Sequence, residues 1–155
     1  MKALTICQPY ASLICDGRKR IENRSWPTGY RGPLLIHAGK SKNYLEGWNV
    51  RRDGFLPQPM PLGAVVGMAE LVACYHLPAI REKKIQLPPE HSWIHSHQHT
   101  EGPALWVLED VQRLKEPIPW NGKQGLWDPA ELIASVDWMF AELLPVQPVD
   151  ERDSK

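Results

Sequence analysis

One stretch of the chain, residues 63–77, most constrains the fold. It reads G-A-V-V-G-M-A-E-L-V-A-C-Y-H-L and predicts a long strand, with glycines that permit the bend a small barrel needs. A second run, A-L-W-V-L-E-D-V-Q-R-L at 104–114, predicts another strand, and L-L-I-H-A at 34–38 predicts a short buried one. Further short strands are expected at 19–25 and 125–127. The fold must therefore hold a sheet of several strands.

Helices are expected between and beside these strands. Pro9 suits the first helical position and Gly17 suits the left-handed residue that ends a helix, so the two residues delimit the first one. A polar, helical segment is predicted at 41–53. The sequence D-P-A-E at 128–131 has the N-cap, proline and glutamate of a helix start, and this helix is expected to run to about Leu144. Together these elements indicate an α+β fold with a mixed sheet curled into a small barrel.

The length of 155 residues indicates one domain, assigned to residues 1–145, with a polar tail at 146–155 that is predicted to be disordered. The sequence has no run of about 18 apolar residues, so no membrane span is expected. The apolar run at the N-terminus is too short for a signal peptide, which predicts a cytoplasmic protein. Three cysteines without a C-x-x-C pair indicate reduced thiols rather than disulfides.

The formal net charge is zero, but the charges are segregated along the chain. Residues 18–52 hold nine Lys and Arg against two Glu, a net charge of +7. Residues 100–155 hold five basic and eleven acidic residues, a net charge of −6. The basic segment could offer a positive face to phosphates, or the two halves could simply attract each other.

Residues 17–24 read G-R-K-R-I-E-N-R. On a continuous strand, Lys19 would lie on one face and Glu22 and Arg24 on the other. If the first turn still belongs to the helix end, Lys19 and Glu22 can face the same cleft. The segment is therefore either a solvated sheet edge or the lining of an anion-binding cleft.

This segment matches G-x-K-x-x-E-x-R, the signature of the ASCH domain family, and the chain resembles the family in further segments. These are, in order, L-T-I-C-Q-P-Y-A, W-P-T-G-Y-R-G-P-L-L-I-H-A-G-K, G-A-V-V-G-M-A-E-L-V-A-C and A-L-W-V-L-E-D-V-Q-R-L-K-E-P-I-P. The resemblance covers about residues 3–128. It implies a β-barrel related to the PUA fold, with the signature lining a cleft between the first helix and the barrel.

The resemblance also implies a ligand, because PUA domains bind RNA and the ASCH family is linked to RNA binding. Lysine and arginine suit phosphate, glutamate accepts hydrogen bonds from the exocyclic amine of a base, and aromatic rings stack on bases. We therefore expect RNA, a nucleotide or a modified nucleoside as the partner. The residues expected to bind it are Gln8, Tyr10, Lys19, Glu22, Arg24, Trp26, Tyr30, His37 and Lys40.

A hydrolase is the alternative that the resemblance implies. One bacterial branch of the family removes the acetyl group from N4-acetylcytidine with a Lys, a Thr and a Glu, and another member behaves as a ribonuclease. Lys19 matches the catalytic lysine of that branch, but Glu22 stands where the branch has its threonine. A carboxylate cannot replace a hydroxyl nucleophile. An enzyme would instead use Lys19 as a base or electrostatic stabiliser and Glu22 as a general base that positions water.

The segment 91–99 reads H-S-W-I-H-S-H-Q-H and holds four histidines. The first two would face together on a helix and the last three on a strand, and either spacing could bind zinc. However, no cysteine or carboxylate lies at ligand spacing, and two prolines just before the segment place it in a loop. We expect a solvated loop near the cleft, with no metal site and no cofactor.

Overall fold

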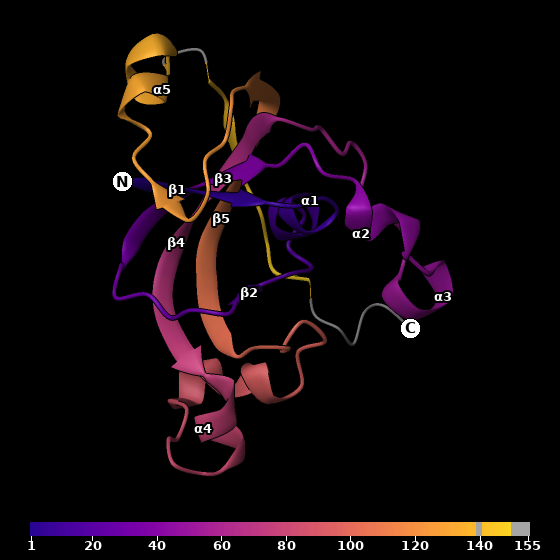
Figure 1. Ribbon diagram of the computed structural model, residues 1–155, viewed down its shortest axis with the longest axis vertical. Coiled ribbons are helices and arrows are strands. Elements are labelled where there is room, and N and C mark those ends of the chain that lie inside the picture. The colour runs from indigo at the N-terminus through magenta and orange to yellow at the C-terminus, as the bar shows by residue number, and fades with distance from the viewer. Residues whose placement is uncertain (139–140, 150–155) are drawn as a thin grey trace.

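The computed structural model describes residues 1–138 and 141–149, and over these residues seven strands form one curled sheet (Figure 1). The sheet order is β2-β5-β4-β3-β1-β6, and β7 pairs with β5. The strands are β1 (Lys2–Ile6), β2 (Ile21–Arg24), β3 (Gly32–Ala38), β4 (Ala64–His76), β5 (Ala104–Pro119), β6 (Leu126–Trp127) and β7 (Leu143–Pro145).

The two long apolar runs form the two longest strands, as predicted. β4 and β5 pair antiparallel along most of their length, with register shifts at three points, and such irregularities bend a strand. β3 pairs antiparallel with β4, whereas β1 pairs parallel with β3. The sheet is therefore mixed and strongly curved, and the predicted α+β barrel class is confirmed.

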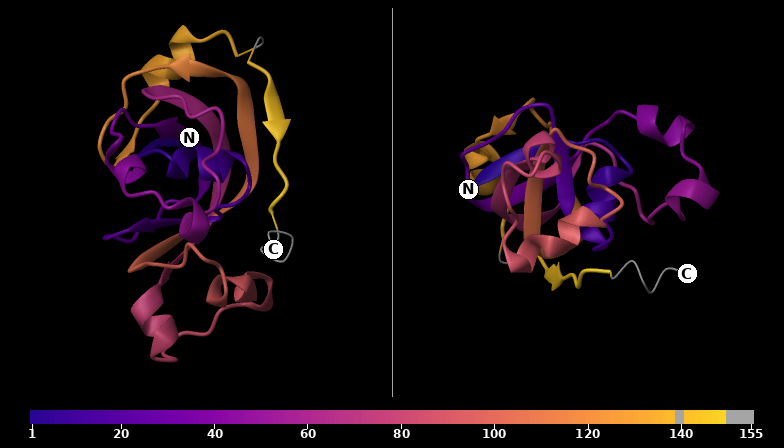
Figure 2. Two further views of the ribbon diagram at one scale, coloured as in Figure 1. Left: turned by 90° about the vertical axis from the view of Figure 1, so that its right-hand side faces the viewer. Right: turned by 90° about the horizontal axis from the view of Figure 1, so that it is seen from below.

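Short helices occupy the connections and the ends of the sheet. They are α1 (Tyr10–Cys15), α2 (Asn43–Glu46), α3 (Val50–Asp53), α4 (Leu77–Arg81), the 3-10 helix η1 (Pro89–His95) and α5 (Ala130–Ser135). α1 packs against β3, β4 and β5, while α2 and α3 project to one side of the barrel (Figures 1 and 2). The predicted helical segment at 41–53 thus consists of two single turns. None of the helices in the described ranges is long and apolar enough to cross a membrane.

The predicted C-terminal helix starts where expected, with the Ala130 amide donating to Asp128 at 2.9 Å, but its predicted end at Leu144 is wrong. α5 ends at Ser135, and Leu143–Pro145 form β7 on the edge of β5. Leu143 packs there against the cluster that contains buried Leu114. Strand pairing together with this burial outweighs a local preference for helix.

The predicted disordered tail, 146–155, falls mainly on residues outside the described part of the chain. Its first four residues are described and continue from β7. The Val146 amide donates to the Val111 carbonyl at 2.9 Å, and the Val149 amide donates to the Gly17 carbonyl at 3.1 Å. The chain therefore passes alongside the end of α1.

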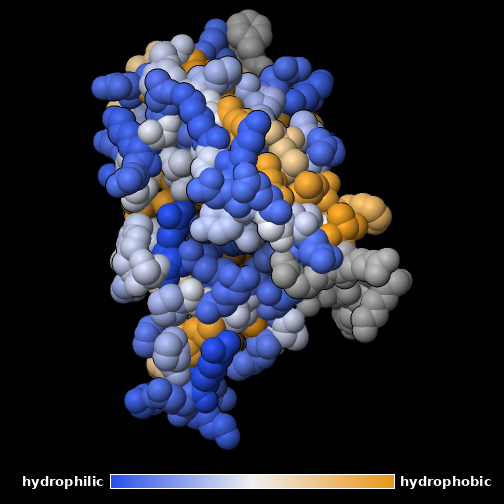
Figure 3. Space-filling view, turned by 45° about the vertical axis from the view of Figure 1, so that its right-hand side comes forward, coloured by the Kyte–Doolittle hydropathy of each residue, from blue (hydrophilic) through white to orange (hydrophobic). Residues whose placement is uncertain are grey.

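The core lies between α1 and the concave face of the sheet. Ile14 of α1 packs in one cluster with Leu34, Ile36 and Trp106, all of which are fully buried. The face of the molecule shown in Figure 3 is mainly hydrophilic, with most of its hydrophobic side chains in a diagonal band. The three cysteines are free thiols.

Candidate functional site

The G-R-K-R-I-E-N-R segment forms the passage from α1 to β2. Gly17 has a φ of +85°, which only glycine adopts without strain, and this residue ends the helix. The Lys19 amide then donates to the Leu13 carbonyl at 3.0 Å, so Lys19 belongs to a turn and β2 begins only at Ile21. Because Lys19 precedes β2, its side chain does not have to follow the alternation of side chains between the two faces of that strand.

A buried carboxylate lies at the centre of the site. Lys19 Nζ is 2.9 Å from Glu22 Oε2 and also donates to the Ile21 carbonyl. Arg24 Nε lies 3.1 Å from Glu22 Oε1, without the alignment of a hydrogen bond, and Arg24 Nη2 donates to the Thr5 carbonyl at 2.9 Å. The side chains of Lys19 and Glu22 are only 3% and 9% exposed. Two cations therefore hold one carboxylate in a fixed orientation.

These three charged residues line a cavity of about 220 Å³. Its walls come from the end of β1, α1, β2, α2 and the loop that holds His99 and Glu101. Tyr10 and Tyr44 stand on the wall with their ring centroids 5.4 Å apart and their planes at 67°. Burial raises the pKa of Tyr10, so its hydroxyl remains a hydrogen-bond donor at neutral pH. The cavity thus combines one fixed carboxylate with an aromatic wall.

His99 contributes a neutral imidazole to the same wall. Burial and then the nearby Lys19 lower the pKa of His99 to about 3, because both disfavour the protonated ring. Its Nε2 is buried without a hydrogen-bond partner, and its backbone carbonyl accepts from Asn23 Nδ2 at 2.8 Å. The loop is therefore anchored to β2 beside the carboxylate.

Three of the expected ligand-binding residues lie outside this cavity. Gln8 is fully buried and donates to Ser12 Oγ and to the Pro61 carbonyl, both at 2.8 Å, so it joins α1 to the proline-rich loop. His37 Nε2 is 2.9 Å from the carbonyl oxygen of residue 120, and Lys40 Nζ donates to the side chain of residue 121. Their contacts hold the loop after β5 in place.

Two expected stacking residues also lie elsewhere. Trp26 packs edge-to-face against buried Trp106, with ring centroids 4.8 Å apart, and the Tyr30 hydroxyl donates to the Pro33 carbonyl at 2.7 Å. Neither residue lines the cavity. Of the nine expected ligand-binding residues, the structure brings together Tyr10, Lys19, Glu22 and Arg24.

Sequence reasoning did not single out Tyr44 or Asn23, and it placed His99 in a loop near the cleft without assigning it a role in ligand binding. Of the histidines of 91–99, His97 and His99 lie together, with ring centroids 5.5 Å apart, whereas His91 Nδ1 is 2.7 Å from the Tyr75 hydroxyl. No group of three or more His, Cys, Asp or Glu able to hold a metal ion occurs within residues 1–138 and 141–149. Of the four histidines of 91–99, His99 lines the cavity.

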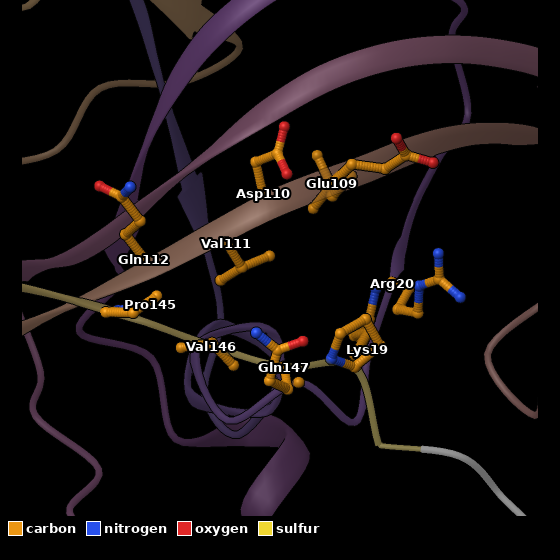
Figure 4. A pocket seen from close by; sticks show the side chains of 12 residues that line it. Lys19, Arg20, Glu109, Asp110, Val111, Gln112, Pro145, Val146 and Gln147 are labelled. Atoms are coloured by element: carbon orange, nitrogen blue, oxygen red, sulfur yellow. The ribbon is translucent and has the colours of Figure 1, made fainter.

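A larger cavity of about 600 Å³ lies on the other side of Lys19, between β5 and residues 145–148 (Figure 4). Arg20, Glu109 and Asp110 border it, but the Glu22 carboxylate and the tyrosine pair do not. The chemistry suited to recognising a base is therefore gathered in the smaller cavity.

The fold and this site define a small PUA-like α+β barrel domain with a charged cavity beside its first helix. The sequence matches the family model described as "ASCH domain" over residues 4–125, and the chain belongs to the ASCH domain family. The structure is similar to the crystal structure of ASCH from Zymomonas mobilis, with a TM-score of 0.50 and 16% identity, over 92% of this chain and 96% of that one. This likeness concerns the fold.

Among curated proteins, the chain is similar to Activating signal cointegrator 1 from Homo sapiens, with 28% identity over 137 residues. The corresponding protein from Mus musculus is 28% identical over 133 residues. Each alignment covers 80% of this chain but only 21% of the relative, so the chain spans about a fifth of the length of these relatives.

Proposed function

We propose that the domain binds RNA by taking one nucleobase, or a modified nucleoside, into the cavity beside Glu22. The observation that carries this proposal is the buried carboxylate held between Lys19 and Arg24 at the wall of an open cavity. Breaking such a buried pair is costly, and replacing it with apolar residues often is not, so its presence favours a role beyond stability. The association of the ASCH family with RNA gives the ligand class.

Glu22 has capacity left for a ligand. An ionised carboxylate offers about four lone-pair positions, and the Lys19 hydrogen bond on Oε2 occupies one of them. The remaining positions can accept from an exocyclic amine or a ring N–H of a base. Lys19 and Arg24 then act by orienting Glu22 rather than by contacting phosphate, and Tyr10 provides the apolar wall.

The size of the cavity sets how much of the ligand enters it. Its volume of about 220 Å³ lies below the roughly 300–1,000 Å³ of pockets that enclose drug-sized ligands. A cavity of about 220 Å³ accommodates one base better than a whole nucleotide. We infer that the sugar and phosphate of the bound nucleotide stay at the mouth of the cavity, where solvent and the rest of the RNA strand can reach them.

The contacts of Lys19 favour binding over hydrolysis. A lysine that serves as general base must hold a free electron pair, whereas Lys19 Nζ already donates to Glu22 and to the Ile21 carbonyl. Glu22 in turn is engaged by two cations, so an attacking water would have to share its oxygens with them. The hydrolase alternative therefore requires this network to rearrange.

The test is the affinity of the wild-type chain and of a Glu22→Gln variant for ribonucleosides, including N4-acetylcytidine, and for single-stranded RNA. Loss of one hydrogen bond to a charged acceptor predicts binding weaker by roughly 10- to 150-fold. Glu70→Gln is the matched control, because Glu70 lies on β4 and does not line the cavity. Equal affinities of the two variants would overturn the proposal.

Two further measurements keep the test decisive. Tyr44→Ala removes a half-exposed ring from the wall, so it weakens binding without the folding risk of a change in the buried network. Release of cytidine or of cleaved RNA by the wild type, abolished in Lys19→Ala while RNA affinity persists, would support the hydrolase instead.

A further inference from the structure

The segment from α2 to the end of the following turn, residues 43–55, presents aromatic side chains to solvent. Tyr44 is 54% exposed and Phe55 is 79% exposed, although residues of these types usually bury most of their surface. Val50 between them is also exposed. We refer to residues 43–55 as the α2–α3 segment. Exposed rings gathered beside a cavity mark a contact surface rather than part of the core.

We propose that the α2–α3 segment is a stacking surface for the nucleotides next to the base held in the cavity, so the site binds a short single strand of RNA. This inference rests on the proposed function and extends it from one base to a strand. Aromatic rings beside basic residues hold successive bases of a single strand with little regard to sequence.

Two further rings lie next to the ring of Tyr10 at the edge of the cavity. Tyr10 on the cavity wall contacts Tyr44 edge-to-face, and the Tyr10 and Trp48 ring centroids are 6.4 Å apart. Trp48 Nε1 donates to the Gly54 carbonyl at 2.8 Å, which ties the outer turn to the ring cluster. Tyr44 therefore lies at the cavity, and Trp48 connects this ring cluster to the turn that carries Phe55.

The backbone that presents Phe55 is fixed on two sides. The carbonyl of Phe55 accepts from Arg18 Nη1 at 2.6 Å, and Arg18 in turn pairs with Asp16 at 2.6 Å. The turn before it is closed by the Asn49 amide, which donates to Asp53 Oδ2 at 3.0 Å. An exposed ring on an anchored backbone loses little conformational freedom when it binds, which suits it to recognition.

The size of this surface favours RNA over a protein partner. Residues 43–55 carry two basic and two acidic residues, so this segment would hold a strand through its aromatic rings rather than through net charge. A stable protein interface buries about 800 Å² on each partner, whereas this surface offers a few side chains on two single-turn helices. Figure 2 shows these helices standing out from the barrel, where a strand can pass over them.

The experiment compares a free ribonucleoside with a fluorescein-labelled, single-stranded RNA of eight nucleotides and mixed sequence. Phe55→Ala is the decisive variant, since Phe55 does not line the cavity and its exposure makes the change harmless to folding. It should weaken binding of the octanucleotide by roughly 5- to 150-fold and leave nucleoside binding unchanged. Phe55→Tyr should restore binding, and Ile85→Ala, at an apolar residue after α4 that is 39% exposed, should have no effect.

The outcomes separate this inference from the proposed function. If nucleosides bind and the octanucleotide binds no better, or if Phe55→Ala changes neither affinity, the stacking surface is refuted while the cavity proposal stands. If neither probe binds the wild-type chain, both fail. If the wild type self-associates in sedimentation and Phe55→Ala is monomeric, the surface is a protein interface and the inference is again refuted.

Discussion

Removing the amine of Lys19 tests whether the buried charge network is coupled as its geometry indicates. Lys19→Met keeps the unbranched stem but leaves Glu22 buried, with Arg24 as the remaining cation. At the observed separation of 2.9 Å, two unit charges attract by about 6 kcal/mol at an effective dielectric constant of about 20. Part of this attraction offsets the desolvation of both groups, and Arg24 still compensates Glu22.

We expect Lys19→Met to lower the free energy of unfolding by about 3 kcal/mol, the lower end of the range for breaking a buried pair. For a chain of this size, that loss corresponds to a decrease in Tm of about 6–12 °C. Urea denaturation followed by tryptophan fluorescence measures it, with an unchanged m-value as the check on two-state unfolding. Adding Glu22→Leu should recover most of the loss, because no uncompensated carboxylate then remains buried.

An exposed pair in the same chain is the control. Lys115 Nζ lies 2.8 Å from Glu142 Oε2, nearly the separation of the buried pair, but both side chains are more than half exposed. Lys115→Met should change Tm far less than Lys19→Met does, since solvent screens the exposed pair. The reasoning is refuted if the two lysine variants have equal effects, or if the double variant loses the sum of the single losses.

Three further predictions concern buried side chains. The pKa of His99 lies near 3 when folded, against about 6.5 when unfolded, so the unfolded chain binds the extra proton between these values. Stability should therefore fall as pH drops through this window, and His99→Gln should flatten that slope in urea titrations. A Cβ at Gly122 would lie 2.5 Å from His37 Nδ1, so Gly122→Ala should cost about 1–3 kcal/mol, whereas Gly29→Ala, with nothing within 4 Å, should not lower Tm. Burial raises the pKa of Cys15 to about 12, so a thiol reagent should label the other two cysteines in the native protein and Cys15 only after unfolding.

The sheet was largely predictable because its signals are local. Residues 63–77 and 104–114 are apolar runs bounded by turn residues, and they form β4 and β5. The strand β7 was not predictable in this way, since Leu143–Pro145 becomes extended only by pairing with a distant edge of β5. A local preference for helix carries no information about an open strand edge of β5 that lies about 30 residues earlier in the chain.

The expected role of His37 shows a signal that was present but unused. Leu34, Ile36 and Ala38 face the cluster that contains α1, whereas Leu35 belongs to a different cluster. Strand alternation places His37 on the face of Leu35, away from α1 and its cavity. Once the face of this strand that packs against α1 is known, alternation excludes His37 from the site.

The structure places the predicted stacking residues outside the cavity for a different reason, because sequence proximity was used to choose them. Trp26 and Tyr30 follow the basic segment closely in sequence, but β2 ends at Arg24 and the chain then turns away from the cavity. Tyr44 enters instead from α2, and nothing local in residues 41–53 indicates that this helix folds back over α1. Side chains from separate elements meet through the tertiary fold, so neighbours in sequence are poor guides to neighbours in a cavity.

The spacing K-x-x-E-x-R follows from the break between helix and strand. Glu22 and Arg24 are two residues apart on β2 and share a face, while Lys19 reaches the same face from the turn before the strand. The turn is fixed on its outer side by the Val149 amide, which donates to the Gly17 carbonyl, and the Gly17 backbone lies against residue 147 so closely that no Cβ fits. The orientation of Lys19 therefore depends on residues 146–149 as well as on the signature. Loss of that contact should disturb the carboxylate network although none of its members is changed.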